Sequence, residues 1–193
     1  MISIDLETTS VNPIEADIVG ISLSIKSNSG YYIPILYPEK SKNNFGDDDL
    51  VTVLSLLKKT LENPLIKKVG QNIKYDSLIF SRNGINIEGI YFDTMIAAHI
   101  LNPAARSYKL DILSLEYLNY SMVPIEELIG KGKEQITMDK VPLEQTTFYA
   151  SEDADITLQL AELFIPRLEE NKQMEFYQNI EIPLVNVLMN MEK

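Results

Sequence analysis

Two acidic residues near the N-terminus, in the stretch I-D-L-E-T, are the first that could do chemistry. The stretch is typical of a short buried strand, and side chains alternate along a strand. Asp5 and Glu7 therefore point to one face while Ile4 and Leu6 point to the other. Two like charges side by side repel, and burying them costs several kcal/mol unless a cation lies between them. The pair predicts either a cation site or a solvated strand end.

Two further stretches carry groups of the same kind. V-G-Q-N-I-K-Y-D places Asn72 and Asp76 four residues apart, where a strand gives way to a helix. In Y-A-S-E-D-A-D, Tyr149 and Asp153 stand at i and i+4 and share one helix face. If the four carboxylates converge, they form an oxygen-only pocket without histidine or cysteine. Such a pocket suits Mg²⁺ or Mn²⁺ and disfavours zinc.

Each of these stretches has a simpler reading when taken alone. The strand pair could lie at a solvated strand end, and Asp76 could interact with the positive N-terminal end of a helix. The cluster Glu152, Asp153 and Asp155 could be a solvated helix face. The three stretches in this order, on a strand, a helix start and a helix, favour a common site.

The elements that must position these residues follow from hydrophobic periodicity and from turn residues. Gly30 with the preceding S-N-S predicts a hairpin turn, Asp93 is the expected N-cap of its helix, and Pro166 and Pro183 are expected to interrupt or start helices. Three strands followed by alternating strands and helices indicate an α/β domain with a mixed sheet. The expected strands are 1–6, 18–25, 31–36, 66–70 and 89–93, and the expected helices are 47–63, 74–84, 94–101, 109–119, 125–129, 142–170 and 178–193.

Composition limits the class of protein. The 193 residues suit one domain, with 45% hydrophobic and 23% charged residues. No apolar run reaches 18 residues, so no transmembrane helix is expected, and no signal peptide is evident. The absence of cysteine excludes disulfides and thiolate catalysis and fits a cytoplasmic protein.

The formal net charge of −11 argues against a basic surface that grips nucleic acid. Two groups of lysines, Lys67/Lys68/Lys74 and Lys131/Lys133, are interpreted as solvated surface. The one histidine, His99, lies in an apolar stretch and is expected to pack on a helix instead of acting as a ligand or base.

Longer stretches around these residues resemble a known family. D-L-E, N-I-K-Y-D and Y-A-S-E-D are similar to the three exonuclease motifs of the DEDD superfamily in its tyrosine subtype. V-G-Q-N-I-K-Y-D, F-D-T-M, G-K-G-K, Y-A-S-E-D-A-D-I-T-L-Q-L and N-I-E-I-P-L-V resemble the proofreading domain of bacterial DNA polymerase I enzymes (family A), in register over essentially the whole chain. The resemblance implies a ribonuclease-H-like (DnaQ-like exonuclease) fold with a central mixed five-stranded sheet. It also implies 3′→5′ removal of mismatched nucleotides.

The same resemblance implies a division of the chain and a set of roles. Residues 1–177 would form the exonuclease domain, and residues 178–193 a helix leading into a polymerase domain. Asp5, Glu7 and Asp153 would hold one divalent cation, Mg²⁺ or Mn²⁺, and Asp5 and Asp76 a second. Tyr149 would orient the attacking water together with Glu7, because a phenol with a pKa near 10 is a poor proton acceptor. The products would be nucleoside 5′-monophosphates.

Substrate contacts are also implied by correspondence with the family. Gln71, Asn72 and Tyr75 would line the groove for the DNA strand, with Thr8 beside them. Val11 stands where the family commonly has a leucine that wedges between the last two bases. Ile125 stands where a stacking aromatic residue is usual, and loss of stacking costs ~1–3 kcal/mol per base. Core packing of Ile125 is the alternative.

The implied partners are the single-stranded 3′ end of DNA and the polymerase domain of the same chain. No membrane partner is expected, and the protein is expected to be a monomer. Three other interpretations remain open. A ribonuclease-D-like 3′→5′ RNA exonuclease uses the same motifs. Some relatives are catalytically silent nucleic-acid-binding scaffolds. D-L-E-T could also be a variant phosphatase loop, which the glutamate at position 7 disfavours.

Overall fold

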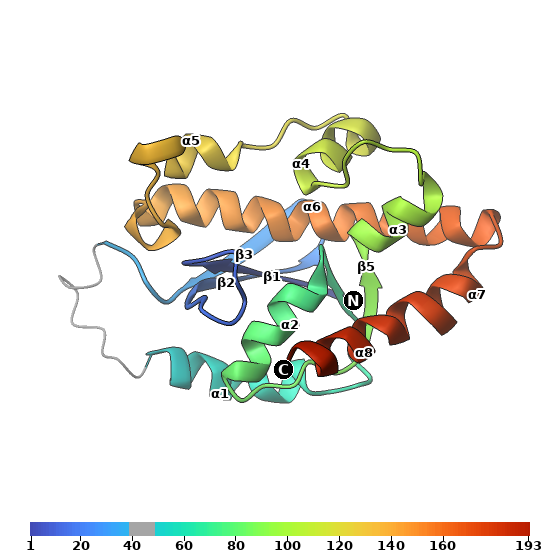
Figure 1. Cartoon of the computed structure of the whole chain (residues 1–193), viewed down its shortest axis with the longest axis horizontal. Helices are drawn as coiled ribbons and strands as arrows, with labels where there is room; N and C mark the ends of the chain where they lie inside the picture. Colours follow the sequence, from blue (N-terminus) through green and yellow to red (C-terminus); the bar gives the residue numbers. More distant parts are fainter. Residues whose placement is uncertain (39–48) are drawn as a thin grey trace.

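A five-stranded sheet forms the centre of the protein in our computed structural model, which describes residues 1–38 and 49–193 (Figure 1). Its strand order is β3-β2-β1-β4-β5. The β1–β2 and β2–β3 pairs are antiparallel, whereas β1–β4 and β4–β5 are parallel, so the predicted mixed sheet is confirmed. The strands are β1 (Ile2–Thr8), β2 (Ile18–Lys26), β3 (Ser29–Pro34), β4 (Lys68–Gly70) and β5 (Ile90–Asp93).

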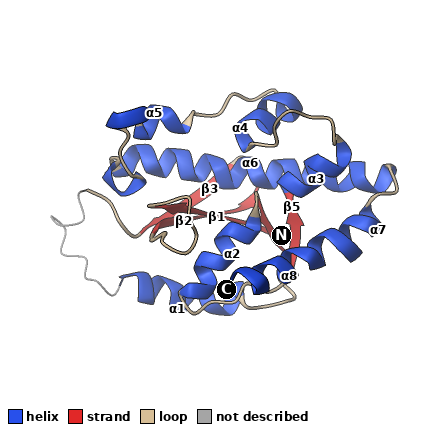
Figure 2. Ribbon diagram, viewed as in Figure 1, coloured by secondary structure: helices blue, strands red, loops and turns tan. Residues whose placement is uncertain are grey.

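Helices cover both faces of this sheet (Figure 2). The long helix α6 crosses one face, while α1 and α2 lie on the other, with the C-terminal α8 packed beside α2 (Figure 1). The helices are α1 (Asp49–Leu61), α2 (Ile73–Arg82), α3 (Thr94–Leu101), α4 (Leu110–Leu113), α5 (Ile125–Ile129), α6 (Leu143–Glu170), α7 (Met174–Phe176) and α8 (Ile182–Glu192). One π-helical segment follows α4 (Ser114–Leu118) and another follows α7 (Tyr177–Glu181).

The two faces of β1 differ in chemistry, as alternation along the strand requires. Ile4 and Leu6 are buried in a core formed with α1 and α2, to which α2 contributes Ile79 and Phe80. A second core joins α6 to β4, β5, α3 and α4. The acidic residues of β1 therefore lie on the face that α6 covers.

Small side chains bring α6 close to that face. The β1–β2 register pairs Ser3 with Ser24, Asp5 with Ser22 and Glu7 with Gly20. Paired residues share a face, so β2 places Gly20, Ser22 and Ser24 beside the acidic residues on the face that α6 covers. At Gly30 an added Cβ would lie 2.1 Å from the carbonyl oxygen of Ser151 in α6, so a larger residue does not fit.

Two of the predictions made from the sequence are wrong. Lys68 is fully buried instead of solvated, because β4 lies between β1 and β5 with both faces covered. Its ammonium donates to the carbonyl of Asn63 at 2.6 Å, and burial lowers its pKa. Pro166 does not interrupt α6, which continues to Glu170. Both Pro166 and the residue four before it, Glu162, are exposed, so the carbonyl that loses its helical donor faces water.

One other expectation holds, since Pro183 lies in the first turn of α8. His99 lies on α3 but is exposed, and its ring meets Tyr108, in the coil before α4, edge-on at 5.2 Å between centroids. The expected helix start at residues 47–48 lies outside the described residues. In the two described ranges, no helix has the length and apolar character needed to cross a bilayer. Helix α8 packs Val185 and Met189 against α2.

Candidate active site

Three carboxylates meet where β1 passes under α6. Asp5 and Glu7 come from β1 and Asp153 from α6, and one oxygen from each lies within 4.8 Å of the others. The alternation of β1 turns its two acidic side chains toward the helix, and the helix presents Asp153 one turn after Tyr149. Carboxylates at this separation repel unless protons or a cation compensate their charge.

Asp76, the fourth carboxylate, approaches from α2 and is 3% exposed. Its Oδ1 accepts a hydrogen bond from the backbone N–H of Leu6 at 3.1 Å. That N–H is available because β4 pairs with β1 only at Ile2 and Ser3. Asp76 is outside the group of three, and it interacts electrostatically with Asp5. Asp5 is thus the carboxylate next to both Asp76 and Asp153.

Burial makes ionisation of all four acids costly. It raises the pKa of Asp5 to about 6 and the pKa values of Glu7, Asp76 and Asp153 well above their usual range. The negative charge of Asp5 is the second cause for the latter three. Within residues 1–38 and 49–193, no lysine or arginine forms an ion pair with any of the four. An oxygen-only set that lacks a protein cation fits hard divalent ions.

The group of three opens into a cavity of about 780 Å³. One wall comes from the segment between α5 and α6, which sequence reasoning did not assign to the site. The only signal for it was the pair of glycines in G-K-G-K, Gly130 and Gly132, which adopt the left-handed backbone conformation needed to turn the chain. This segment contributes Gly132, Gln135, Ile136, Thr137 and Met138 to the wall, beside Ile129 at the end of α5.

Tyr149 lines the same cavity, one helical turn before Asp153. Burial raises the pKa of its phenol strongly, and the charges of Asp153 and Glu7 add to the effect. The phenol therefore stays protonated at any working pH and can donate a hydrogen bond.

Thr8 and Tyr75 line the cavity and also hold the loop that follows β1. Their hydroxyl oxygens are 2.7 Å apart, and the carbonyl oxygen of Ser10 accepts from both, at 3.0 Å from Thr8 and 2.5 Å from Tyr75. On this loop Val11 lines the cavity and is 95% exposed, so its side chain is available to a ligand.

Asn72 lines the cavity at the start of α2. Its backbone is left-handed and its side chain makes no capping hydrogen bond. Asp93 holds this turn, since its carboxylate accepts from the N–H groups of Asn72 and Ile73 at 3.2 and 2.8 Å. The same carboxylate caps α3 through Met95 and Ile96, which confirms the predicted N-cap. Asp93 therefore fixes the backbone from which the Asn72 amide reaches the cavity.

The other two predicted contact residues differ in placement. Ile125 begins α5, is 40% exposed, and lines both the main cavity and a smaller one of about 280 Å³ on which Tyr149 and Asp153 also border. Gln71 is not brought into the main cavity. Its side-chain amide donates to the carbonyl of Tyr108 at 2.7 Å and accepts from the Thr94 hydroxyl.

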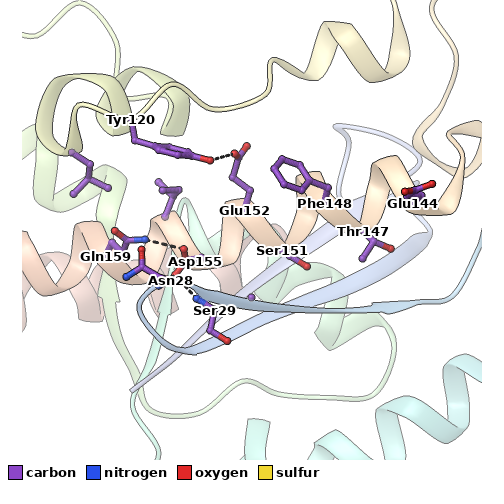
Figure 3. A pocket seen from close by; sticks show the side chains of 13 residues that line it. Asn28, Ser29, Tyr120, Glu144, Thr147, Phe148, Ser151, Glu152, Asp155 and Gln159 are labelled. Carbon is purple, nitrogen blue, oxygen red and sulfur yellow. Dashed lines mark hydrogen bonds between the residues drawn. The ribbon is translucent and has the colours of Figure 1, made fainter.

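Helix α6 is anchored by two acids whose interactions are drawn in Figure 3, in a cavity of about 620 Å³. Glu152 accepts from the Tyr120 hydroxyl at 2.7 Å (Figure 3). It also accepts from the backbone N–H of Val123 at 2.9 Å. Asp155 accepts from the N–H groups of Asn28, in the turn between β2 and β3, and of Ser29, the first residue of β3. The Asp155 bonds hold α6 against the β2–β3 hairpin, and the Glu152 bonds hold it against the segment that follows α4. Together they fix Tyr149 and Asp153 over β1.

Solved structures share this fold. The NrnC nuclease of Brucella melitensis with bound Mg²⁺ aligns with a TM-score of 0.73 and 17% identity, over 99% of this chain and 84% of that one. RNase D of Escherichia coli, an exoribonuclease, aligns with a TM-score of 0.71 and 18% identity, over 97% of this chain and 44% of that one. The POL domain of Pol1 from M. smegmatis, in complex with DNA primer-template and dNTP, aligns with a TM-score of 0.72 and 19% identity, over 99% of this chain and 28% of that one. The predicted ribonuclease-H-like fold is confirmed.

Closer sequence relatives are longer proteins. DNA polymerase I of Pseudomonas aeruginosa is 36% identical over 196 residues, covering 100% of this chain and 21% of that protein. DNA polymerase I of Borreliella burgdorferi is 38% identical over 192 residues, covering 100% of this chain and 20% of that protein. The chain thus spans about a fifth of the length of the curated relatives that it matches. The sequence model of the 3′-5′ exonuclease family matches residues 1–169, and the chain belongs to that family.

Proposed function

We propose that this chain hydrolyses the 3′-terminal phosphodiester of single-stranded DNA, releases nucleoside 5′-monophosphates, and serves as the proofreading domain of a longer DNA polymerase. Family membership gives the 3′-5′ exonuclease activity. The observation that carries the proposal is the meeting of Asp5, Glu7 and Asp153 within 4.8 Å, beside Tyr149, in an open cavity. Carboxylates so arranged have no structural role that compensates for their repulsion.

The donor set supports two cation positions. Asp5, Glu7 and Asp153 would hold one divalent cation, and Asp5 with Asp76 a second, Mg²⁺ or Mn²⁺ in each case. When bound, such ions lower the pKa of water and stabilise the attacking and leaving oxygens of an in-line displacement at phosphorus. Because Asp76 also accepts the Leu6 N–H, its carboxylate stays next to Asp5 before any ion arrives.

The protein groups around the reacting phosphate have separate tasks. Tyr149 donates a hydrogen bond that orients the attacking water, and Glu7 accepts one from the same water. Tyr149 does not take the proton, because burial keeps its phenol protonated. Asn72 offers a free amide to the terminal nucleotide, since Asp93 and not its own side chain holds the turn. Val11 separates the last bases and Ile125 packs against one of them.

Delivery of the DNA strand would depend on the rest of the polymerase. The net charge of −11 gives this chain little attraction for phosphate beyond that of bound cations. We propose residues 1–177 as the exonuclease domain and residues 178–193 as the link to a polymerase domain. Leu184, Val187 and Met191 of α8 are 42%, 53% and 77% exposed and could meet that domain. We further propose that the protein acts as a monomer in the cytoplasm.

A direct test uses the purified chain, a 5′-labelled DNA oligonucleotide and Mg²⁺. The expected result is stepwise shortening from the 3′ end with release of nucleoside 5′-monophosphates, faster on a 3′-mismatched primer-template than on a matched one. The Asp153→Asn variant is the matched control, since it keeps the side-chain shape and removes one charge. EDTA should stop the reaction.

Other outcomes separate the alternatives. Shortening of an RNA oligonucleotide at an equal or higher rate would favour a ribonuclease-D-like RNA exonuclease. No shortening of either substrate by the unmutated protein would overturn the enzymatic proposal and favour a silent scaffold. Tight binding of single-stranded DNA in EDTA at physiological salt would contradict the expected dependence on cations.

A further inference from the structure

Tyr32, on β3, buries its hydroxyl group inside the protein. In the described part of the chain this hydroxyl has no hydrogen-bond partner. A buried polar group without a partner costs free energy, so its position calls for a reason. Its neighbour Tyr31 is 56% exposed on the same strand. Only one of the two adjacent tyrosines therefore points into the protein.

The register of the sheet shows where the Tyr32 side chain goes. Tyr32 pairs with Ser22, which pairs with Asp5, so the three side chains share the face covered by α6. The next pair on that face is Glu7 with Gly20. The phenol lies over Gly20: an added Cβ there would be 2.2 Å from the Tyr32 hydroxyl oxygen and 2.3 Å from the ring carbon that bears it.

This placement brings the hydroxyl beside Glu7. Cβ atoms of directly paired residues on antiparallel strands are about 4.5–5.5 Å apart. The Tyr32 hydroxyl occupies the space that the Gly20 Cβ would fill, directly across from Glu7. The electrostatics agree, since the pKa of Tyr32 is raised by burial and then by the charges of Glu7 and Asp5. The phenol therefore remains a hydrogen-bond donor.

We propose that Tyr32 is a positioning residue of this site: its buried hydroxyl has no partner in the metal-free protein, and it donates a hydrogen bond to the ionised carboxylate of Glu7 when a cation is bound, which holds that carboxylate toward Asp5 and Asp153. Gly20 provides the space for the phenol. The inference rests on the proposed function, since the proposed function is what makes Glu7 a cation ligand and the acceptor of a hydrogen bond from the attacking water.

The physical role follows from the needs of Glu7. An ionised carboxylate has about four acceptor positions, and a cation and a water leave some of them unfilled. A phenol that donates to one of them makes a charge-assisted bond and fixes the side-chain rotamer. Loss of such an outer partner of a metal ligand typically lowers metal affinity or activity 10- to 100-fold. Tyr32 itself touches neither substrate nor cation.

The test compares Tyr32→Phe with Tyr31→Phe in the whole chain. Mn²⁺ affinity is measured by titration calorimetry, thermal midpoints are measured with EDTA and with Mn²⁺, and kcat and KM are measured on single-stranded DNA. For Tyr32→Phe we expect Mn²⁺ affinity or kcat to fall 10- to 100-fold. The midpoint in EDTA should stay unchanged or rise, because the lost hydroxyl had no partner. KM should not change, and Tyr31→Phe should match the unmutated protein.

The outcomes distinguish this proposal from the proposed function. If the unmutated chain binds Mn²⁺ and cuts DNA, and Tyr32→Phe equals it in both respects, the positioning role is wrong while the exonuclease proposal stands. If the unmutated chain binds Mn²⁺ but does not cut DNA, the Mn²⁺ affinity of the two variants still decides the role of Tyr32. A chain that binds no Mn²⁺ overturns both. A fall in the EDTA midpoint, with unchanged Mn²⁺ affinity, would assign Tyr32 a merely structural role.

A second variant tests the space over Gly20. Gly20→Ala forces the phenol away from its place, since the hydroxyl oxygen and two ring carbons all lie within 2.4 Å of the new Cβ. We expect it to weaken Mn²⁺ binding at least as much as Tyr32→Phe does. Adding Tyr32→Phe to Gly20→Ala should cause no further loss of Mn²⁺ affinity. Additive losses in the double variant would overturn the coupling.

Discussion

The carboxylate of Asp76 accepts a hydrogen bond from the backbone N–H of Leu6 at 3.1 Å, although 70 residues separate the two in sequence. Leu6 lies between the two acidic residues of β1, and its side chain belongs to the opposite face. The bond therefore ties the start of α2 to the strand that carries Asp5 and Glu7. Asp76 has a structural task and a chemical one, and substitutions can separate them.

Asp76→Asn should retain the structural task and lose the chemical one. The amide oxygen can still accept from Leu6, so the free energy of unfolding in EDTA should not fall. Exonuclease activity should fall more than ~100-fold. Loss of a residue that only supports a metal ligand already lowers metal affinity or activity 10- to 100-fold, and Asp76 is proposed as a ligand itself. Asp76→Ala should also leave the Leu6 N–H without a partner, at a cost of about 1–3 kcal/mol. Urea denaturation in EDTA and a nuclease assay check both. Equal unfolding free energies for the two variants would contradict this division.

Asp5→Asn should stabilise the metal-free protein at neutral pH. Burial raises the pKa of Asp5 from 3.8 to about 6, so the folded state binds this proton more tightly than the unfolded state does. The stabilisation that protonated Asp5 provides is present below pH ~4 and is lost as pH rises through about 6. At pH 7.5 in EDTA the variant should be more stable by roughly 2–3 kcal/mol.

The difference between Asp5→Asn and the unmutated protein should shrink as pH falls from 7.5 to 4.5, which urea denaturation at several pH values in EDTA measures. Saturating Mg²⁺ should stabilise the unmutated protein at pH 7.5 and should stabilise the variant much less. A difference that is independent of pH would show that Asp5 is ionised without cost.

Tyr149→Phe should lower kcat while leaving cation affinity intact. The phenol orients the attacking water and is not a ligand, so its loss should cost about 10- to 100-fold, the range for a hydrogen bond to a charged group. Burial keeps the pKa of Tyr149 far above the working range, so the variant and the unmutated protein should have pH–rate profiles of the same shape up to pH 9. Steady-state kinetics and Mn²⁺ titration test this. A basic limb that disappears in the variant would instead identify Tyr149 as a titrating group.

Ile125→Phe should tighten binding of single-stranded DNA. Ile125 is 40% exposed at the cavity, so a ring at this position can stack on a base. Stacking contributes ~1–3 kcal/mol per base, which corresponds to roughly tenfold or more in affinity. Fluorescence anisotropy in the Asp76→Asn background, which should prevent cleavage, measures the change. Leu56→Phe on α1, also exposed, is the control and should have no effect.

The carboxylates of the proposed metal site could be predicted from sequence because part of their geometry is local. Alternation along β1 and the i, i+4 spacing on α6 each fix which side chains share a face, whatever the tertiary structure. The N-cap at Asp93 is local in the same sense. Its second task, holding the N–H groups of Asn72 and Ile73, joins segments about 20 residues apart and has no sequence pattern.

The features that escaped prediction depend on burial, which is a tertiary property. The pair Lys67 and Lys68 has the composition of a solvated surface, yet β4 lies inside the sheet and only Lys67 is exposed. Tyr32 and Tyr31 are indistinguishable in sequence, and only the register with β2 shows which of them lies over Gly20. Pro166 continues its helix because its side of α6 faces water.

The serine- and glycine-lined strand β2 has a consequence for protein design. Ser22 and Ser24 lie opposite Asp5 and Ser3, Gly20 opposite Glu7 leaves room for the Tyr32 phenol, and Gly30 at the start of β3 admits the α6 backbone at Ser151. A designer who grafts the four carboxylates onto another α/β sheet should carry over these small neighbours, since valine or isoleucine in their place would compete with Tyr32 and α6 for the same space. The transferable unit is therefore the acidic strand together with its small-residue neighbour, and the spacing of the carboxylates is encoded largely by residues that carry no charge.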